Sequence, residues 1–210
     1  MKSSFYSLIA ILLLSQASLA QLRAGFGVKA GTGLSRIDYP GSYNDNLGNT
    51  QWTPAAYAGM FGKVSLGPIF LQAEVLYSLR GDHKKYAVTG GDTYKGERFH
   101  YISVPLLFGF RPIKKLSIVL GCEPGRVIGA WAYGGGKTKN TDSAFTHRTN
   151  FDLDAGLAWA ITRKWSIEGR FLFGARELKD YLWQNGPRRF IREQNGYSKV
   201  VQIGVTYQLK

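Results

Sequence analysis

The chain has 210 residues, with 27 Lys and Arg against 14 Asp and Glu and a formal net charge of +13. This length suits one domain of moderate size. Cys122 is the only cysteine, which excludes an intramolecular disulfide and a thiolate metal cluster. The 26 glycines and 29 aromatic residues are typical of β-structure with many turns.

The first twenty residues have the pattern of a secretory signal peptide. Lys2 precedes seven apolar residues at 8–14, and Ser18 and Ala20 place small side chains at the cleavage positions. We therefore predict a signal peptide over residues 1–20, with the mature domain over 21–210 and a net charge of +12. Seven apolar residues are far fewer than the ~20 that a membrane-spanning helix needs. No long apolar run follows, so any membrane crossing must use strands.

The first mature strand is expected over residues 24–34, where apolar residues alternate with glycines and Lys29. Glycine weakens a strand, so a row of glycines on one face needs a physical reason. A crowded barrel interior, in which large side chains from opposite strands require space, supplies one. A phosphate-binding GxGxxG loop is the alternative, but no helical pattern follows it.

Residues 55–80 predict a hairpin with a tight turn at 66–68. In its second strand, Glu74 and Arg80 lie on the face opposite an apolar row, and Leu76 is the only apolar residue among them. In its first strand, Tyr57 and Phe61 lie on a face that also carries Lys63. Aromatic side chains of this kind can fill a narrow interior.

Five more strands follow the hairpin, with Pro105 in the first of them placed at a bulge. We expect them over residues 98–110, 116–131, 151–160, 165–174 and 201–209. Long connections are expected at 36–54, 81–96, 133–150 and 177–195, and short ones at 66–68, 111–115 and 161–164. The sequence thus predicts an all-β fold: an eight-stranded antiparallel up-and-down transmembrane β-barrel with short periplasmic turns and long extracellular loops.

The less apolar face of these strands distinguishes a membrane barrel from a soluble one. A soluble, lipocalin-like barrel would place its apolar face inward and show water a surface dense in charge. Here the other face is mostly small residues with a few charges of both signs, which suits a filled polar interior. The charged residues on it are Lys29, Lys63, Glu74, Glu123, Asp154, Glu168 and Arg170.

Several stretches resemble the small outer-membrane β-barrel proteins of Bacteroidetes that are grouped as the PorT-like family. They are residues 59–81, 101–110, 116–125 and 200–209, with Glu74-Val75-Leu76-Tyr77 and Val104-Pro105-Leu106 as the recurring motifs. The resemblance implies an outer-membrane barrel, in a family whose members mostly lack an established activity and whose namesake is linked to protein secretion. This chain departs from the family in ending on Lys210 rather than an aromatic residue, and in having Cys122 at a position usually held by a small residue.

The interior charges are the first candidate site. An eight-stranded barrel is just wide enough to be filled by side chains, so an open solute channel is not expected. We predict an interior polar network of Lys29, Glu74, Glu168 and Arg170. A structural ion-pair network is the favoured interpretation, because broken buried pairs are costly. A gated polar path is the alternative.

Catalysis is considered because some small outer-membrane barrels modify lipids. The candidate bases are His83, His100 and His147, and the first and last of these lie in predicted loops. Ser103, three residues after His100, is expected on the opposite strand face. We predict no enzyme activity, no catalytic residue, no cofactor and no metal site. An envelope-lipid hydrolase that acts on lipid A is the alternative.

The basic loops are the second candidate site, and Arg188, Arg189 and Arg192 form their densest cluster. Arginine can bind phosphate with two hydrogen bonds, so lipopolysaccharide is a possible partner, as is an acidic envelope protein. Simple solvation of the loops is the alternative. We expect a monomer that binds no nucleic acid and has a structural or binding role in the envelope. An accessory of a secretion system is a further alternative.

Overall fold

The computed structural model describes residues 22–38, 51–83, 96–134, 137–140, 149–175, 178–181 and 193–209. The predicted signal peptide lies outside these residues. The strands are β1 (Leu22–Asp38), β2 (Thr53–Leu66), β3 (Ile69–Asp82), β4 (Gly96–Ser103), β5 (Leu106–Ile113), β6 (Leu116–Gly134), β7 (Lys137–Asn140), β8 (Thr149–Ala160), β9 (Trp165–Gly174), β10 (Leu178–Tyr181) and β11 (Glu193–Gln208).

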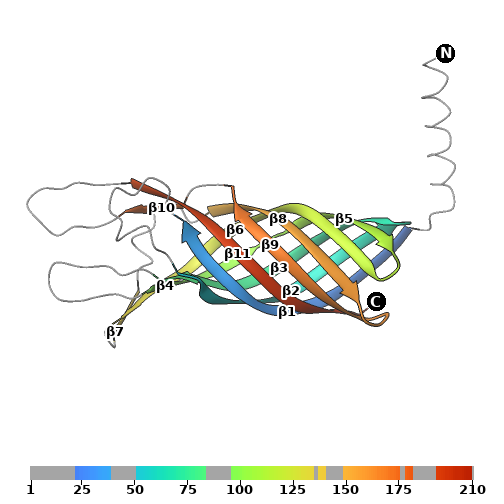
Figure 1. The fold of residues 1–210 in the computed structure, drawn as a ribbon, viewed down its shortest axis with the longest axis horizontal. Helices are drawn as coiled ribbons and strands as arrows, with labels where there is room; N and C mark the ends of the chain where they lie inside the picture. Colours follow the sequence, from blue (N-terminus) through green and yellow to red (C-terminus); the bar gives the residue numbers. More distant parts are fainter. Residues whose placement is uncertain are drawn as a thin grey trace, which may run out of the picture.

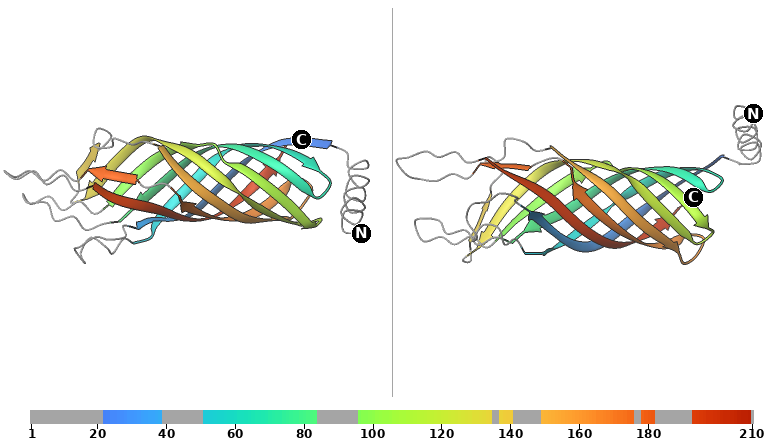
Figure 2. Two further views of the ribbon diagram at one scale, coloured as in Figure 1. Left: turned by 90° about the horizontal axis from the view of Figure 1, so that it is seen from above. Right: turned by 45° about the horizontal axis from the view of Figure 1, so that its top comes forward.

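These strands form one closed antiparallel barrel (Figure 1). The barrel closes where β1 pairs with β11, with Ala30 opposite Val205. Strands β4 and β5 are successive halves of one barrel strand, since both pair with β3 and β6. The hairpin partners β7 and β10 extend β6 and β11 beyond the barrel wall (Figure 2). The predicted eight-stranded barrel is therefore confirmed.

The break between β4 and β5 lies at Pro105, inside the strand predicted over residues 98–110 and at the position where a bulge was expected. Pro105 has no N–H to donate to the ladder, so regular pairing cannot continue through it. The adjoining backbone groups pair locally instead. The Glu74 N–H donates to the Pro105 carbonyl at 2.9 Å, and the Val104 N–H donates to the Pro124 carbonyl at 2.9 Å.

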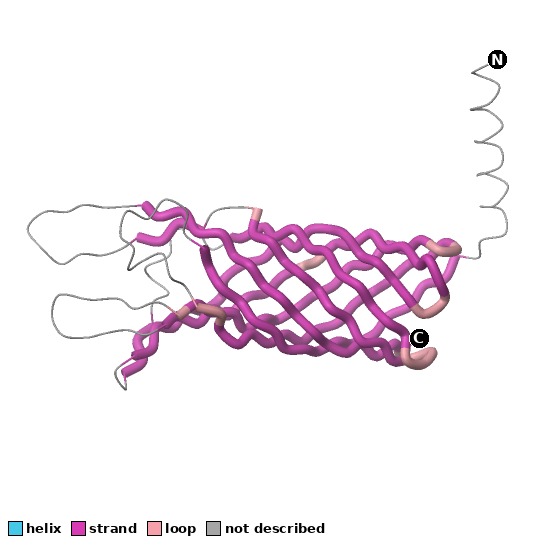
Figure 3. Tube along the Cα trace, viewed as in Figure 1, coloured by secondary structure: helices cyan, strands magenta, loops and turns pink. Residues whose placement is uncertain are grey.

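The connections at the two ends of the barrel differ in length. At one end, Gly67 adopts a φ of 60°, which glycine tolerates without a Cβ clash, and forms the predicted tight turn. The other two short turns lie at the same end (Figure 3), as do the beginning of β1 and the end of β11 (Figure 1). At the opposite end, every strand except β5 and β9 extends into a segment predicted as a loop. Cross-strand pairing there keeps backbone N–H and C=O groups satisfied.

The apolar face of the barrel points outward. Met60, Leu71 and Leu120 are 62%, 64% and 59% exposed, whereas Glu74 is only 1% exposed. This arrangement is the reverse of a soluble barrel, whose apolar side chains would fill the interior. No helix in the described part of the chain has the length and hydropathy to cross a membrane.

Interior glycines make room for aromatic side chains, as the pattern of the first strand predicts. A Cβ on Gly27 would lie 2.7 Å from Cζ of Phe61. A Cβ on Gly204 would overlap the hydroxyl of Tyr57, and both aromatic side chains are buried. The glycines of β1 and β11 thus determine where the rings of β2 lie.

The Gly204→Ala substitution is expected to destabilise the barrel by about 1–3 kcal/mol, because the added methyl group displaces the Tyr57 ring from a filled interior. Gly62→Ala is the matched control, since a Cβ there meets nothing within 4 Å. Urea unfolding followed by gel mobility of unheated samples measures both variants. Equal stability of the two would contradict the steric argument.

Candidate functional site in the barrel lumen

The four residues predicted as an interior network are in contact in the lumen. Lys29 Nζ lies 2.8 Å from Oε1 of Glu74 and 2.7 Å from Oε1 of Glu168. Arg170 Nη1 lies 2.7 Å from the second oxygen of Glu74. Tyr57 adds a hydroxyl that donates to Glu168 at 2.8 Å. Residues from β1, β2, β3 and β9 are therefore joined across the interior.

A second cluster, centred on Arg80, continues this network toward the loop end. Arg80 Nη1 donates to Asp152 Oδ2 at 2.6 Å, and its Nη2 donates to Glu123. Asn150 and Ser198 donate to Asp152 at 3.1 and 3.0 Å. Polar side chains thus surround the carboxylate of Asp152, which is fully buried.

Arg170 links the two clusters. Its guanidinium donates to both oxygens of Asp154, and its Nη2 lies 3.8 Å from Oε2 of Glu123. The linked set, which we call the lumen network, has three cationic side chains and five carboxylates. Its charged members are Lys29, Arg80, Arg170, Glu74, Glu123, Asp152, Asp154 and Glu168.

The predicted set omitted four charged members of the lumen network: Arg80, Glu123, Asp152 and Asp154. Alternation places all four on the less apolar face of their strands, the face that points into the lumen. Arg80 is six residues after Glu74 on β3, and Asp152 is two residues before Asp154 on β8, so both pairs point to the same side. Strand parity therefore marks these residues as interior ones, but it does not say which partners they meet.

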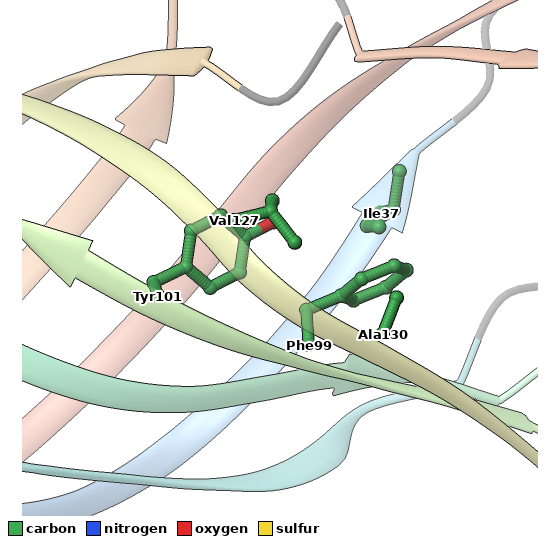
Figure 4. Close-up of a cluster of buried hydrophobic side chains, with 5 residues drawn as sticks. All are labelled: Ile37, Phe99, Tyr101, Val127 and Ala130. Carbon is green, nitrogen blue, oxygen red and sulfur yellow. The ribbon is translucent and has the colours of Figure 1, made fainter. Parts of the chain in front are cut away.

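A cluster of buried apolar side chains lies at the loop end of the barrel, next to the Arg80 cluster (Figure 4). Its members are all 5% exposed or less: Ile37, Phe99, Tyr101, Val127 and Ala130. The Arg80 guanidinium carbon lies 5.1 Å from the centre of the Tyr101 ring, a cation–π distance. This apolar cluster, which we call the apolar plug, joins β1, β4 and β6 at the loop end of the barrel.

The candidate catalytic histidines do not gather around a nucleophile in the described residues. His100 is hydrogen-bonded through Nδ1 to the Tyr77 hydroxyl on the outer face, at 2.5 Å, whereas Ser103 points inward and is 2% exposed. His83 pairs with Gln51 through an isolated bridge. The remaining candidates, His147 and the Arg188, Arg189 and Arg192 cluster, lie outside the described residues. Within the described ranges, no group of three or more His, Cys, Asp or Glu side chains is placed to hold a metal.

Comparison with protein families identifies the family to which this barrel belongs. The family described as outer membrane protein beta-barrel domain matches residues 15–179. The match covers more than half of the chain, so the protein belongs to this family and is an outer-membrane β-barrel. The short-turn end of the barrel is then periplasmic, and the long connections are extracellular.

Solved structures with similar folds are small outer-membrane proteins. Neisserial surface protein A has a TM-score of 0.55 at 12% identity, with 88% of this chain and 98% of that chain covered. OprG from Pseudomonas aeruginosa has a TM-score of 0.49 at 9% identity, with 90% of this chain and 96% of that chain covered. Ail of Yersinia pestis, in complex with the heparin analogue sucrose octasulfate, has a TM-score of 0.47 at 14% identity, with 89% of this chain and 99% of that chain covered. No curated protein matches the sequence.

Proposed function

We propose that this protein is a non-conducting outer-membrane barrel with a structural or binding role in the envelope, and that it is neither an open pore nor an enzyme. The lumen network carries this proposal. Its charged side chains are buried and paired across the interior, so a solute path would require breaking several ion pairs. The apolar plug adds a second barrier at the extracellular end.

Two observations support the non-enzymatic role. His100 and Ser103 point to opposite faces of β4, so they do not form a nucleophile and base pair. The buried carboxylates are engaged by cations and hydrogen-bond donors, as structural ion-pair networks are. Among the described residues, no such feature favours the alternative of an envelope-lipid hydrolase.

The finer parts of the proposal come from the sequence. They are that the chain is exported with a signal peptide at residues 1–20 and that it is related to the PorT-like barrels of Bacteroidetes. In the binding role, Arg188, Arg189 and Arg192 would contact lipopolysaccharide phosphates at the outer leaflet. Replacing all three with glutamine and measuring lipopolysaccharide binding would test that surface directly.

We expect no stable open-channel conductance when the purified protein is reconstituted in planar lipid bilayers, because both the lumen network and the apolar plug block the path. A double variant, Phe99→Ala with Tyr101→Ala, removes two plug residues but none of the charged side chains of the lumen network. It is expected to remain closed as well. Long-lived openings of the unmodified protein, absent from protein-free bilayers, would contradict the proposed function.

A further inference from the structure

A cavity opens at the periplasmic end of the barrel, on the far side of the lumen network from the plug. Its volume is about 820 Å³, which is within the range of small-molecule sites. It is lined by the first residues of β1, the ends of β2 and β5, and the β5–β6 and β8–β9 turns. The cavity is therefore the mouth of the barrel itself, and we call it the basic vestibule.

The charge of the basic vestibule has one sign. Six of its lining residues are cationic, and none of the described residues that line it is acidic. The cationic residues are Arg23, Lys63, Arg111, Lys114, Lys115 and Arg163. In the described part of the chain, none of these six forms an ion pair with a carboxylate. Like charges gathered without counter-ions repel each other, so a bound anion would stabilise the group.

Two of the cations lie on the inner wall rather than on the rim. Lys63 Nζ is 5.4 Å and Arg111 Cζ is 5.0 Å from the centre of the same ring, that of Phe70. Arg111 is also held by a 2.9 Å hydrogen bond from Nη2 to Ser65 Oγ. The ring and the hydroxyl thus position both cations, which is the pre-organisation that lowers the entropic cost of binding.

The basic vestibule narrows at its inner end. A smaller cavity of about 60 Å³ continues past Phe61 and Phe70 and reaches Glu168 and Arg170. The Glu168 carboxylate there is already engaged by Lys29 and Tyr57. A ligand that enters from the periplasm therefore meets the vestibule cations first, and the lumen network stops it.

We propose that the basic vestibule is a periplasmic binding site for a multiply charged, phosphate-bearing ligand. Arg111 and Lys63 form the inner contact, where the guanidinium can donate two hydrogen bonds to phosphate oxygens and the ammonium acts as a compact charge. Hydroxyl groups of Ser117, Thr162 and Ser166 line the same cavity and supply neutral donors. The phosphate can belong to a free small molecule or to a phospholipid headgroup of the inner leaflet.

The first test uses calorimetric titration of pyrophosphate into the full-length protein in a zwitterionic detergent. Lys63→Gln with Arg111→Gln removes the two inner cations and is expected to weaken binding at least about tenfold, since hydrogen bonds to charged groups are strong. Lys114→Gln with Lys115→Gln removes the same charge from a turn at the rim and is expected to weaken binding less. Equal losses in the two variants, or no binding by the unmodified chain, would overturn the proposal.

A second measurement needs no variant and so does not depend on the folding of one. Pyrophosphate is expected to protect Lys63 from acylation by an N-hydroxysuccinimide ester, as measured by mass spectrometry. Lys164 is the internal control, because it is exposed near the same end of the barrel but does not line the cavity. Equal protection of both lysines would show bulk screening and overturn the assigned site.

The two sources of phosphate are separated in nanodiscs. If lipid headgroups occupy the site, adding phosphatidylglycerol to phosphatidylcholine discs should lower pyrophosphate affinity in the unmodified chain much more than in Lys63→Gln with Arg111→Gln. If the ligand is a free molecule, phosphatidylglycerol should lower pyrophosphate affinity equally in the unmodified chain and in the double variant. The site does not depend on the proposed closed lumen, since a conducting barrel could still bind pyrophosphate and a closed one could fail to.

Discussion

Replacing Arg170 with methionine is expected to lower the free energy of unfolding by about 3–5 kcal/mol, the range for breaking a buried ion pair from one side. Arg170 Nη1 lies 2.7 Å from Glu74, and its other nitrogens donate to Asp154. The lumen network already has more carboxylates than cations. Losing a guanidinium leaves Asp154 without its cationic partner, and methionine supplies no hydrogen-bond donors in return.

Urea titration of the detergent-solubilised protein, read by the mobility of unheated samples on gels, measures this loss. Arg163→Met is the matched control, because this arginine lies in the exposed β8–β9 turn and should change stability by no more than about 0.5 kcal/mol. Adding Glu74→Gln to Arg170→Met should recover part of the loss, since one of the stranded charges is removed. A loss in Arg170→Met no larger than in the control would show that the network does not stabilise the barrel.

The sequence predicts well on which face of its strand each residue lies, a property that we call strand parity. Alternation in residues 151–160 and 165–174 placed Asp154, Glu168 and Arg170 on one side, and all three are buried in the lumen. Even the apparent exceptions follow the rule. Leu76, an apolar residue on a polar face, points inward and is 1% exposed. Parity works because a barrel wall separates two environments and the side-chain period is two.

Pairing partners could not be predicted in the same way. Lys29 on β1 reaches Glu74 on β3, past the intervening strand, and Arg170 on β9 reaches the same carboxylate. Which residues meet across a barrel depends on strand tilt and stagger, and these follow from the register of all the strands together. Parity identifies the interior residues but not their depth. Four members of the network were missed for this reason: Arg80, Glu123, Asp152 and Asp154.

The basic vestibule was missed for a related reason. Its cations come from four separate parts of the chain, and no short window of sequence contains more than three of them. Arg111 was assigned to a short turn over 111–115, whereas the structure places it in β5 with its guanidinium against Phe70. Closure of the barrel brings these segments together, so the site exists only at the level of the whole sheet.

Because the apolar face of the barrel points outward, a charge placed on it is expected to cause a large loss of stability. Leu120→Arg should destabilise the barrel in lipid by about 2–4 kcal/mol, the cost of a cation on the lipid face near the bilayer midplane. Leu120 is 59% exposed and pairs with Phe108 on β5 and Ala155 on β8. It lies on β6 between Trp131 toward the loop end and Leu116, which pairs with Trp159, at the turn end.

Ile161→Arg is the depth control for this experiment. Ile161 is 55% exposed, about as much as Leu120, but it lies in the β8–β9 turn at the periplasmic interface, where the same charge costs about 0–1 kcal/mol. Both variants would be refolded into phosphatidylcholine vesicles and unfolded in guanidinium, with tryptophan fluorescence as the readout. A near-zero effect at both positions would mean that Leu120 faces water rather than hydrocarbon. A large effect at Leu120 alone would show that lipid solvates this face of the barrel, because Ile161 carries the same charge in a turn at the interface, which also lines the basic vestibule.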